Sequence, residues 1–256
     1  MNKVLLFLLL IPSAALAQSP FDGTWTVDSK AWLPEKLEVY LLADGVFRGT
    51  GWIGDGEIKA DGQDRKVVKT DYYDTVSVRI LDAHRVEIIA KKVGKPMFTE
   101  VDTISPDGNT LTQELKDTTE SQPVRMETSF RRTEKAPSGS HALSGSWQAY
   151  QTKRSNNGTT ITYRCTAEGF SAITPLGEGF DAKFDGKDYP VGDDPAHTMV
   201  SVKRISPSAV EITSKRNGRI VGVVHLSAAP DAKSIHVVSE HKERNTTSTY
   251  EMQKQP

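Results

Sequence analysis

Cysteine is nearly absent from this chain, which has one among 256 residues. A single cysteine excludes a framework of intrachain disulfides, and it excludes zinc sites that need two or more thiolates. An excess of one charge is also lacking, because 32 Lys and Arg residues offset 33 Asp and Glu residues. The formal net charge of -1 gives no overall field that would attract nucleic acid or an anionic membrane. We therefore expect no nucleic-acid partner.

Long hydrophobic runs are missing except at the N-terminus. There, Lys3 precedes an apolar run from Val4 to Ile11, and small residues follow at Ala15 and Ala17. A basic start, an apolar segment too short to span a bilayer and a small-residue cleavage site are typical of a secretory signal peptide. We predict that residues 1–17 are removed, that the protein is exported to the periplasm or the extracellular space, and that no transmembrane segment remains.

The rest of the sequence repeats itself. The segment Gly23-Thr24-Trp25 recurs as Gly145-Ser146-Trp147, and Val86-Glu87-Ile88 recurs 124 residues later as Val210-Glu211-Ile212. Several such matches in one order indicate an ancestral duplication. Residues 135–141 are polar, contain Pro and Gly, and have the composition of a linker. We predict a first domain at residues 18–134 and a second at 142–256, each the size of a small domain.

Within each copy, apolar residues alternate with polar ones. The side chains of Val76, Val78 and Ile80 fall on one face of an extended segment, and those of Ser77 and Arg79 fall on the other. Gly and Asp-Gly pairs separate many such segments, and none has the period of a long amphipathic helix. The sequence therefore predicts an all-β fold of short antiparallel strands, arranged as a sandwich or a barrel in each copy.

A Gly-x-Trp near the first strand, followed by a meander of short strands, resembles the lipocalin-like (calycin) group. The residues that carry the resemblance are Gly23 and Trp25 in one copy and Gly145 and Trp147 in the other. The resemblance implies two tandem antiparallel up-and-down β-barrels of about eight strands each, in which these four residues close one end of a barrel. Residues 184–191 are also similar to a segment of secreted bacterial lipocalin-like domains whose role is largely uncharacterised.

The resemblance further implies an arginine near the last strand that packs on the tryptophan, for which Arg131 and Arg132 are the candidates in the first copy. Thr70-Asp71-Tyr72 is similar to a second lipocalin motif. The second copy departs from both patterns, because it has Asp194-Pro195-Ala196 at the position of that motif and Thr249-Tyr250-Glu251-Met252 in its final strand.

A barrel of eight strands is either filled by its own side chains or holds one small ligand. The inward residues expected here are Val, Ile and Leu, so a ligand would be small and apolar. The candidate lining residues are the aromatic residues of the first copy, Trp32, Tyr40, Phe47 and Trp52. Aromatic side chains serve a filled core equally well, and both alternatives stay open.

Sequence motifs of catalysis are absent, because there is no Gly-x-Ser-x-Gly elbow, zinc-protease motif, phosphate loop or dinucleotide fingerprint. Asp193, Asp194 and His197 are weak candidates for metal ligands or acid-base groups, but their spacing matches no established site and a solvated turn also explains them. Cys165 suits either a small buried position or an intermolecular disulfide. We expect no cofactor and no catalytic residue.

Three functional hypotheses follow. The first is an exported tandem lipocalin-like protein that binds or carries a small apolar ligand. The second is a non-catalytic module of the cell envelope, whose filled barrels present loops to another protein or to a glycan. The third is an enzyme acting at a barrel mouth through Asp193, Asp194 and His197.

Overall fold

The computed structural model describes residues 19–28, 33–34, 36–50, 56–67, 72–119, 122–175, 177–243 and 245–256. The predicted signal peptide and the candidates Trp32 and Trp52 lie outside these residues. Within the described part, the chain forms twenty strands and one short 3-10 helix, η2 (Asn156–Gly158), without an α-helix.

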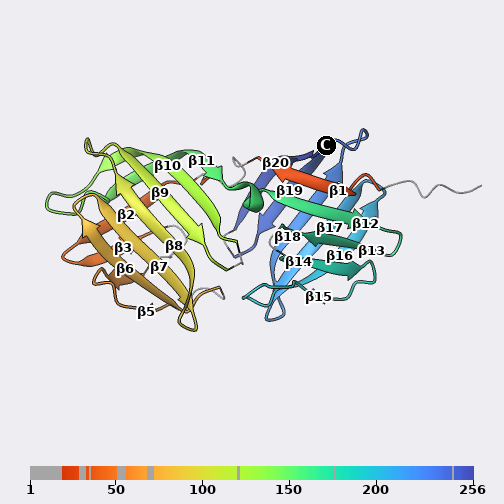
Figure 1. Cartoon of the computed structure of the whole chain (residues 1–256), viewed down its shortest axis with the longest axis horizontal. Coiled ribbons are helices and arrows are strands. Elements are labelled where there is room, and N and C mark those ends of the chain that lie inside the picture. Colours follow the sequence, from red (N-terminus) through yellow and green to blue (C-terminus); the bar gives the residue numbers. More distant parts are fainter. Residues whose placement is uncertain are drawn as a thin grey trace, which may run out of the picture.

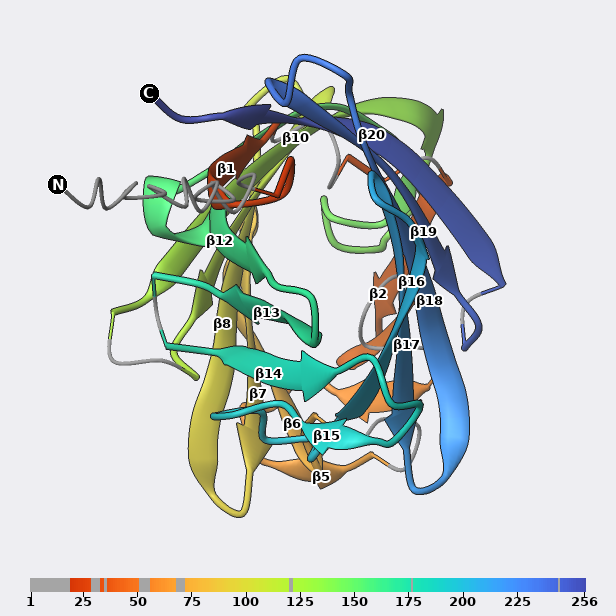
Figure 2. The ribbon, with the colours of Figure 1, turned by 90° about the vertical axis from the view of Figure 1, so that its right-hand side faces the viewer.

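The strands form two ten-stranded antiparallel sheets that lie side by side, each curled into a barrel (Figure 1; Figure 2 views the second barrel from its outer end). The first barrel has the strand order β4-β3-β2-β11-β10-β9-β8-β7-β6-β5, and the second has the order β14-β13-β12-β1-β20-β19-β18-β17-β16-β15. The strands of the first barrel are β2 (Glu38–Ala43), β3 (Val46–Gly49), β4 (Glu57–Lys59), β5 (Arg65–Lys66), β6 (Thr75–Asp82), β7 (Arg85–Lys92), β8 (Lys95–Ile104), β9 (Thr110–Asp117), β10 (Val124–Lys135) and β11 (Gly145–Arg154). Those of the second are β1 (Gly23–Val27), β12 (Thr160–Cys165), β13 (Gly169–Ile173), β14 (Gly179–Lys183), β15 (Tyr189–Pro190), β16 (Met199–Ser206), β17 (Ala209–Arg216), β18 (Arg219–Ala228), β19 (Ser234–His241) and β20 (Thr246–Lys254).

Single bridges bring the edges of each sheet together, between Asp61 and Arg79 in the first barrel and between Gly179 and Gly192 in the second. The prediction of two antiparallel β-barrels is thus confirmed, with ten strands in each rather than about eight. The surplus comes from very short strands near these seams, such as β5 and β15, which have two residues each.

The barrels exchange one strand each (Figure 1). Strand β1 pairs with β12 and β20 of the second barrel, and β11 pairs with β2 and β10 of the first. Trp25 lies in β1 and belongs to the core of the second barrel, whereas Trp147 lies in β11 and belongs to the core of the first. Each Gly-x-Trp segment therefore lies in the barrel that the other half of the sequence forms.

This exchange changes the role of residues 135–141. They were expected to link the two domains, but they run from the end of β10 to the approach to β11, within the first barrel. The chain crosses between barrels at two other places, between β1 and β2 and, through η2, between β11 and β12. The barrels therefore do not follow the division into 18–134 and 142–256, because local composition does not reveal which sheet a strand joins.

Corresponding strands of the two barrels are separated by a constant interval in the sequence. Strands β6, β7, β8 and β9 begin 124 residues before β16, β17, β18 and β19, respectively. This spacing is the same as the interval between the matching sequence segments. It assigns each position on these strands of the first barrel a counterpart in the second.

The end of the first barrel shows why its Gly-x-Trp segment needs glycine. Trp147 is fully buried, its Nε1 donates to the carbonyl oxygen of Leu143 at 2.9 Å, and the guanidinium of Arg132 lies 4.0 Å from the ring centre. Gly145 has a φ of 128°, and a Cβ there would lie 2.5 Å from the main-chain oxygen of Glu134. A side chain would be both strained and sterically blocked at this position.

The second barrel has a related end. Trp25 is fully buried and donates to the carbonyl oxygen of Phe21 at 2.7 Å, while Nζ of Lys254 lies 5.4 Å from its ring centre. Lysine therefore lies over the tryptophan where the first barrel has Arg132. In both barrels the covering cation comes from the last strand of one half and the tryptophan from the first strand of the other.

Replacing Arg132 with alanine is expected to lower the free energy of unfolding by roughly 2–4 kcal/mol, since charged hydrogen bonds and a cation–π contact are lost together. Arg132 donates to the carbonyl oxygens of Gly108, Ala142 and Ser144 at 2.5–2.6 Å. The matched control is Arg131→Ala, because Arg131 covers the exposed ring of Tyr150 at 4.6 Å and should contribute under about 1 kcal/mol. Urea denaturation compares the two variants, and equal losses would contradict the assignment.

The barrels also touch through side chains. Arg216, at the end of β17, donates to the Tyr72 hydroxyl at 2.5 Å, and its guanidinium lies 4.4 Å from the Tyr72 ring centre. The same guanidinium forms an ion pair with Glu243 at 3.1 Å. This contact joins the second barrel to the segment that precedes β6 of the first.

Candidate functional site

Two of the four aromatic residues proposed as ligand-binding residues belong to the buried core of the first barrel. The rings of Tyr40 and Phe47 are 5.8 Å apart, and both side chains are buried. Their packing against each other suits a filled core. The hydroxyl of Tyr40, however, contacts a group of polar residues.

That group is a buried polar cluster inside the first barrel. The Tyr40 hydroxyl donates a hydrogen bond to Glu38 and accepts one from the side-chain amide of Gln113 at 3.0 Å. Glu100 and Asp102 on β8 complete the cluster and are 3% and 0% exposed. Three carboxyl groups, a phenol and an amide are thus gathered in an interior that the sequence predicted to be apolar.

Strand register places Asp102 and Gln113 in one row with two threonines across the barrel wall. Asp102 pairs with Gln113 on β9, Gln113 pairs with Thr128 on β10, and Thr128 pairs with Thr152 on β11. All four side chains are buried, and the two threonine hydroxyls lie 3.2 Å apart. Since paired positions of adjacent strands share a face, the row forms a continuous polar band inside the barrel.

Asp102 is the anomalous member of this band. Neither of its carboxyl oxygens forms a hydrogen bond of normal geometry with the residues that the structure describes, although the side-chain amide of Gln113 lies close enough to lower the pKa of the group. Buried polar groups nearly always have partners, and leaving one unsatisfied costs about 1–3 kcal/mol, more if it is charged. This fully buried carboxyl group therefore has unused capacity to accept hydrogen bonds.

The surroundings of Asp102 oppose its ionisation. Burial raises the pKa of Asp102 well above its usual range, the neighbouring Glu100 and Glu38 carboxyls raise it further, and the nearby Gln113 amide only partly counteracts them. Burial likewise raises the pKa of Glu38, against the hydrogen bond from Tyr40, and it raises the pKa of Tyr40. The cluster therefore favours neutral, protonated acids, and no basic side chain of the described residues is among the groups that act on Asp102.

The second barrel has an apolar interior at the equivalent positions. Its counterparts of Glu100 and Asp102 are Val224 and Leu226, and the counterpart of Gln113 is Val237. Leu226 pairs with Val237 just as Asp102 pairs with Gln113. The two barrels share an architecture but differ at this level, and the polar band belongs to the first alone.

Our sequence reasoning missed Glu38, Glu100, Asp102 and Gln113. The sequence did contain a signal for two of them. When the two halves are aligned at the interval of 124 residues, Glu100 and Asp102 correspond to Val224 and Leu226. Alternation alone places Glu100 and Asp102 on one face of a strand. It does not show that this face points inward.

The weak metal candidates lie elsewhere, in the turn between β15 and β16. Asp194 is buried and its two carboxylate oxygens accept hydrogen bonds from the main-chain nitrogens of Ala196 and Thr198, at 3.0 and 2.7 Å. Asp193 and His197 are exposed beside it. These contacts give Asp194 a structural role in its own turn, and no group of three or more potential metal-binding side chains occurs in the described ranges.

Cys165 ends β12 in the second barrel and is partly exposed. Its Sγ lies 3.4 Å from a guanidinium nitrogen of Arg204, which also donates to the carbonyl oxygen of Thr166. Arg204 in turn lies 4.5 Å from the ring centre of Phe184. The thiol thus sits beside an arginine that already has protein partners.

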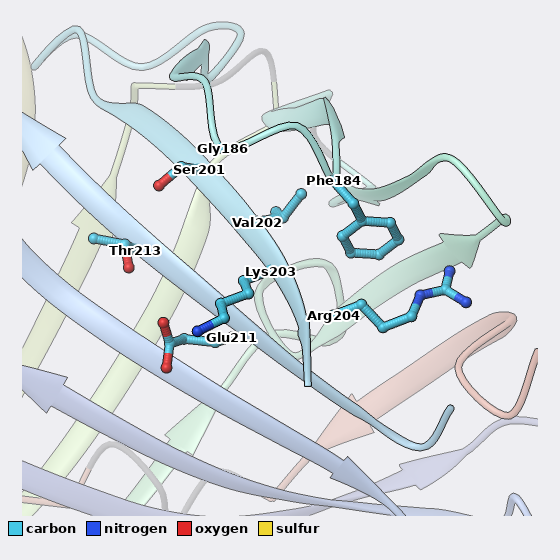
Figure 3. Close-up of a pocket in the computed structure, with 8 residues that line it drawn as sticks. All are labelled: Phe184, Gly186, Ser201, Val202, Lys203, Arg204, Glu211 and Thr213. Carbon is cyan, nitrogen blue, oxygen red and sulfur yellow. The ribbon is translucent and has the colours of Figure 1, made fainter. Parts of the chain in front are cut away.

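Two open hollows lie on the outside of the molecule. One, of about 370 Å³, lies beside β16 and β17, with the Lys203 and Glu211 side chains on one side of the strand and Phe184 and Arg204 beyond it (Figure 3). The other, of about 320 Å³, lies over β2 and β3 and includes Val39 and Leu41. Neither is lined by the polar band.

In comparisons with known proteins, no family model, curated protein or solved structure matches the chain. None of the helical segments in the part of the chain that the structure describes is long and apolar enough to cross a membrane.

Proposed function

We propose that this is an exported, non-catalytic binding protein, built from a duplicated lipocalin-like unit, that holds a small ligand inside its first barrel. The N-terminal signal-peptide pattern supports export, and the two Gly-x-Trp segments and the equal strand spacing support a duplicated barrel unit. In this proposal the second barrel is filled by its own side chains and braces the first through the exchanged strands.

The observation that carries the proposal is the fully buried Asp102 carboxyl group without a hydrogen bond of normal geometry from the described residues. Buried carboxyl groups with shifted pKa values are common at functional sites. Such groups lower the stability of the fold, so their presence in a barrel interior points to a functional role. The equivalent residue Leu226 shows that the fold itself does not require an acid there. The polar band favours a ligand with hydrogen-bond donors over a purely apolar one.

Native mass spectrometry of the gently purified protein tests the proposal. We expect a small-molecule adduct at one copy per chain in the wild type, and its loss in the double variant Glu100→Val, Asp102→Leu, which gives the first barrel the residues of the second. The matched control is Leu226→Met, a volume-conserving change at the equivalent position of the second barrel, which should keep the adduct.

Two results would contradict this function. The first is a wild-type protein that carries no adduct and shows no thermal shift with any member of a library of small polar molecules. The second is an adduct that survives the double variant but is lost in Leu226→Met, which would place the ligand in the second barrel.

A further inference from the structure

We infer that the ligand of the first barrel is a small organic cation, whose ammonium N–H groups donate to Asp102 and Glu100. This inference rests on the proposed function and names the chemical class of its ligand.

The ionisable side chains of the cluster can carry only negative charge. Glu38, Glu100 and Asp102 are all acids, and the charged neighbours that act on Asp102 are the other two carboxyl groups. A carboxylate in a low-dielectric interior needs a partner of opposite charge. With no basic side chain acting on Asp102 from the described residues, a positively charged guest is the complement that the site lacks.

The available hydrogen-bond sites also specify a donor. A carboxylate accepts through both oxygens, and an alkylammonium group offers three N–H donors. Neither oxygen of Asp102 has a hydrogen bond of normal geometry from the described residues, and the nearby Gln113 amide is the only side-chain donor among them that acts on it. A ligand carboxylate or phosphate would add negative charge to three acids, while a hydroxyl would bring one donor and no charge.

A metal ion fits the site less well than an ammonium group. Among the described residues, no three potential metal-binding side chains converge as a metal ion would need. Hydrogen bonds from N–H groups to carboxylates tolerate this wider spacing, because each donor reaches its acceptor separately.

The residues around the acids suit the carbon part of such a ligand. Val86 and Ile88 on β7 are the cross-strand partners of Asp102 and Glu100, and both are fully buried. Across the barrel, the rings of Tyr40 and Phe47 are buried near the same cluster. Aliphatic side chains and aromatic faces next to carboxylates match a short alkyl chain that ends in a cation.

Cation binding should be linked to proton release. Burial and the adjacent acids Glu38 and Glu100 raise the pKa of Asp102, which favours its protonated form; the polar groups facing it also include Tyr40 on β2 and Gln113 on β9. A bound cation stabilises the carboxylate and reverses this balance. Binding should therefore release protons and strengthen as the pH rises.

The experiment titrates the full-length mature protein by calorimetry with three probes of similar size, n-butylammonium, n-butanol and butanoate. We expect n-butylammonium to bind with a heat that depends on the ionisation enthalpy of the buffer, and to bind at least about tenfold more weakly to Asp102→Asn, since hydrogen bonds to charged groups are worth that much. Leu226→Met is the matched control and should bind n-butylammonium as the wild type does.

The outcomes separate the ligand class from the proposed function. If n-butanol or butanoate binds as well as n-butylammonium, or if Asp102→Asn binds n-butylammonium unchanged, the cation inference is wrong although ligand binding stands. If no ammonium probe binds while an adduct co-purifies with the wild type, the cation inference is again overturned. If neither probe nor adduct is found, the proposed function fails as well.

Discussion

A protein cut between Pro137 and Ser138 should remain a single complex under native conditions and separate only when it unfolds. After the cut, the N-terminal fragment still supplies β1 to the interior of the second sheet, and the C-terminal fragment supplies β11 to the interior of the first. Separation would break the pairing of both strands on both edges and expose Trp25 and Trp147, two of the largest fully buried side chains. Loss of one such aromatic side chain typically costs about 3–5 kcal/mol.

This cut is made by inserting a protease site at the exposed Ser138–Gly139 region and is read by size-exclusion chromatography and native mass spectrometry. A second cleavage site, placed instead within η2, leaves only β1 exchanged between the fragments, because β11 then stays with its own sheet. The complex should be weaker after the cut in η2 than after the cut at Pro137. Release of two folded monomers after the first cut would show that the strands are not exchanged in solution.

The double variant Glu100→Val, Asp102→Leu should be more stable than the wild type by about 1–4 kcal/mol in its free energy of unfolding at pH 7, the usual gain when buried ionisable groups are replaced by packed apolar ones. These substitutions introduce the residue types found at the equivalent positions of the second barrel, Val224 and Leu226. Because the same change should abolish ligand binding, a gain in stability with a loss of function would identify a site maintained for binding.

The pH dependence gives this prediction a specific signature. The pKa of Asp102 is higher in the folded protein than its value near 3.9 in an unfolded chain, so the folded state binds more protons between these two values. Wild-type stability attributable to Asp102 is therefore fully present below about pH 4 and is lost as the pH rises, by up to about 1.4 kcal/mol per pH unit. The advantage of the double variant should grow from pH 4 to pH 7.

The reciprocal change Leu226→Asp in the second barrel is the control. It removes a buried leucine and adds an unpartnered acid, so it should lower stability by roughly 3–5 kcal/mol at pH 7, with a smaller loss at pH 4. Urea denaturation of all three proteins at both pH values provides the comparison. A double variant that is less stable than the wild type at pH 7 would mean that Asp102 and Glu100 support the fold.

The predicted strands near Val76–Ile80 and Val86–Ile88 coincide with β6 and β7, because alternation of apolar and polar residues is a local property that tertiary structure preserves. Tyr40 and Phe47 lie in the first barrel core, although the residues that make its interior unusual, Glu100 and Asp102, were not recognised. An acid on an alternating strand looks the same whether its face points to water or to the core. The pairing of β8 with β7 and β9 settles that direction.

By itself, the sequence determined the all-β character and the spacing of the strands, since these depend on turn residues, alternation and repetition along the chain, whereas the choice of barrels over sandwiches came from the lipocalin-like resemblance. Only the tertiary structure decided that β1 and β11 change places and that residues 135–141 do not join the barrels. The physical reason is that Gly23-Thr24-Trp25 and Gly145-Ser146-Trp147 are similar segments, and each supplies a fully buried tryptophan to a barrel. Which barrel each one enters depends on how the intervening chain passes between the sheets, and no local pattern encodes that path.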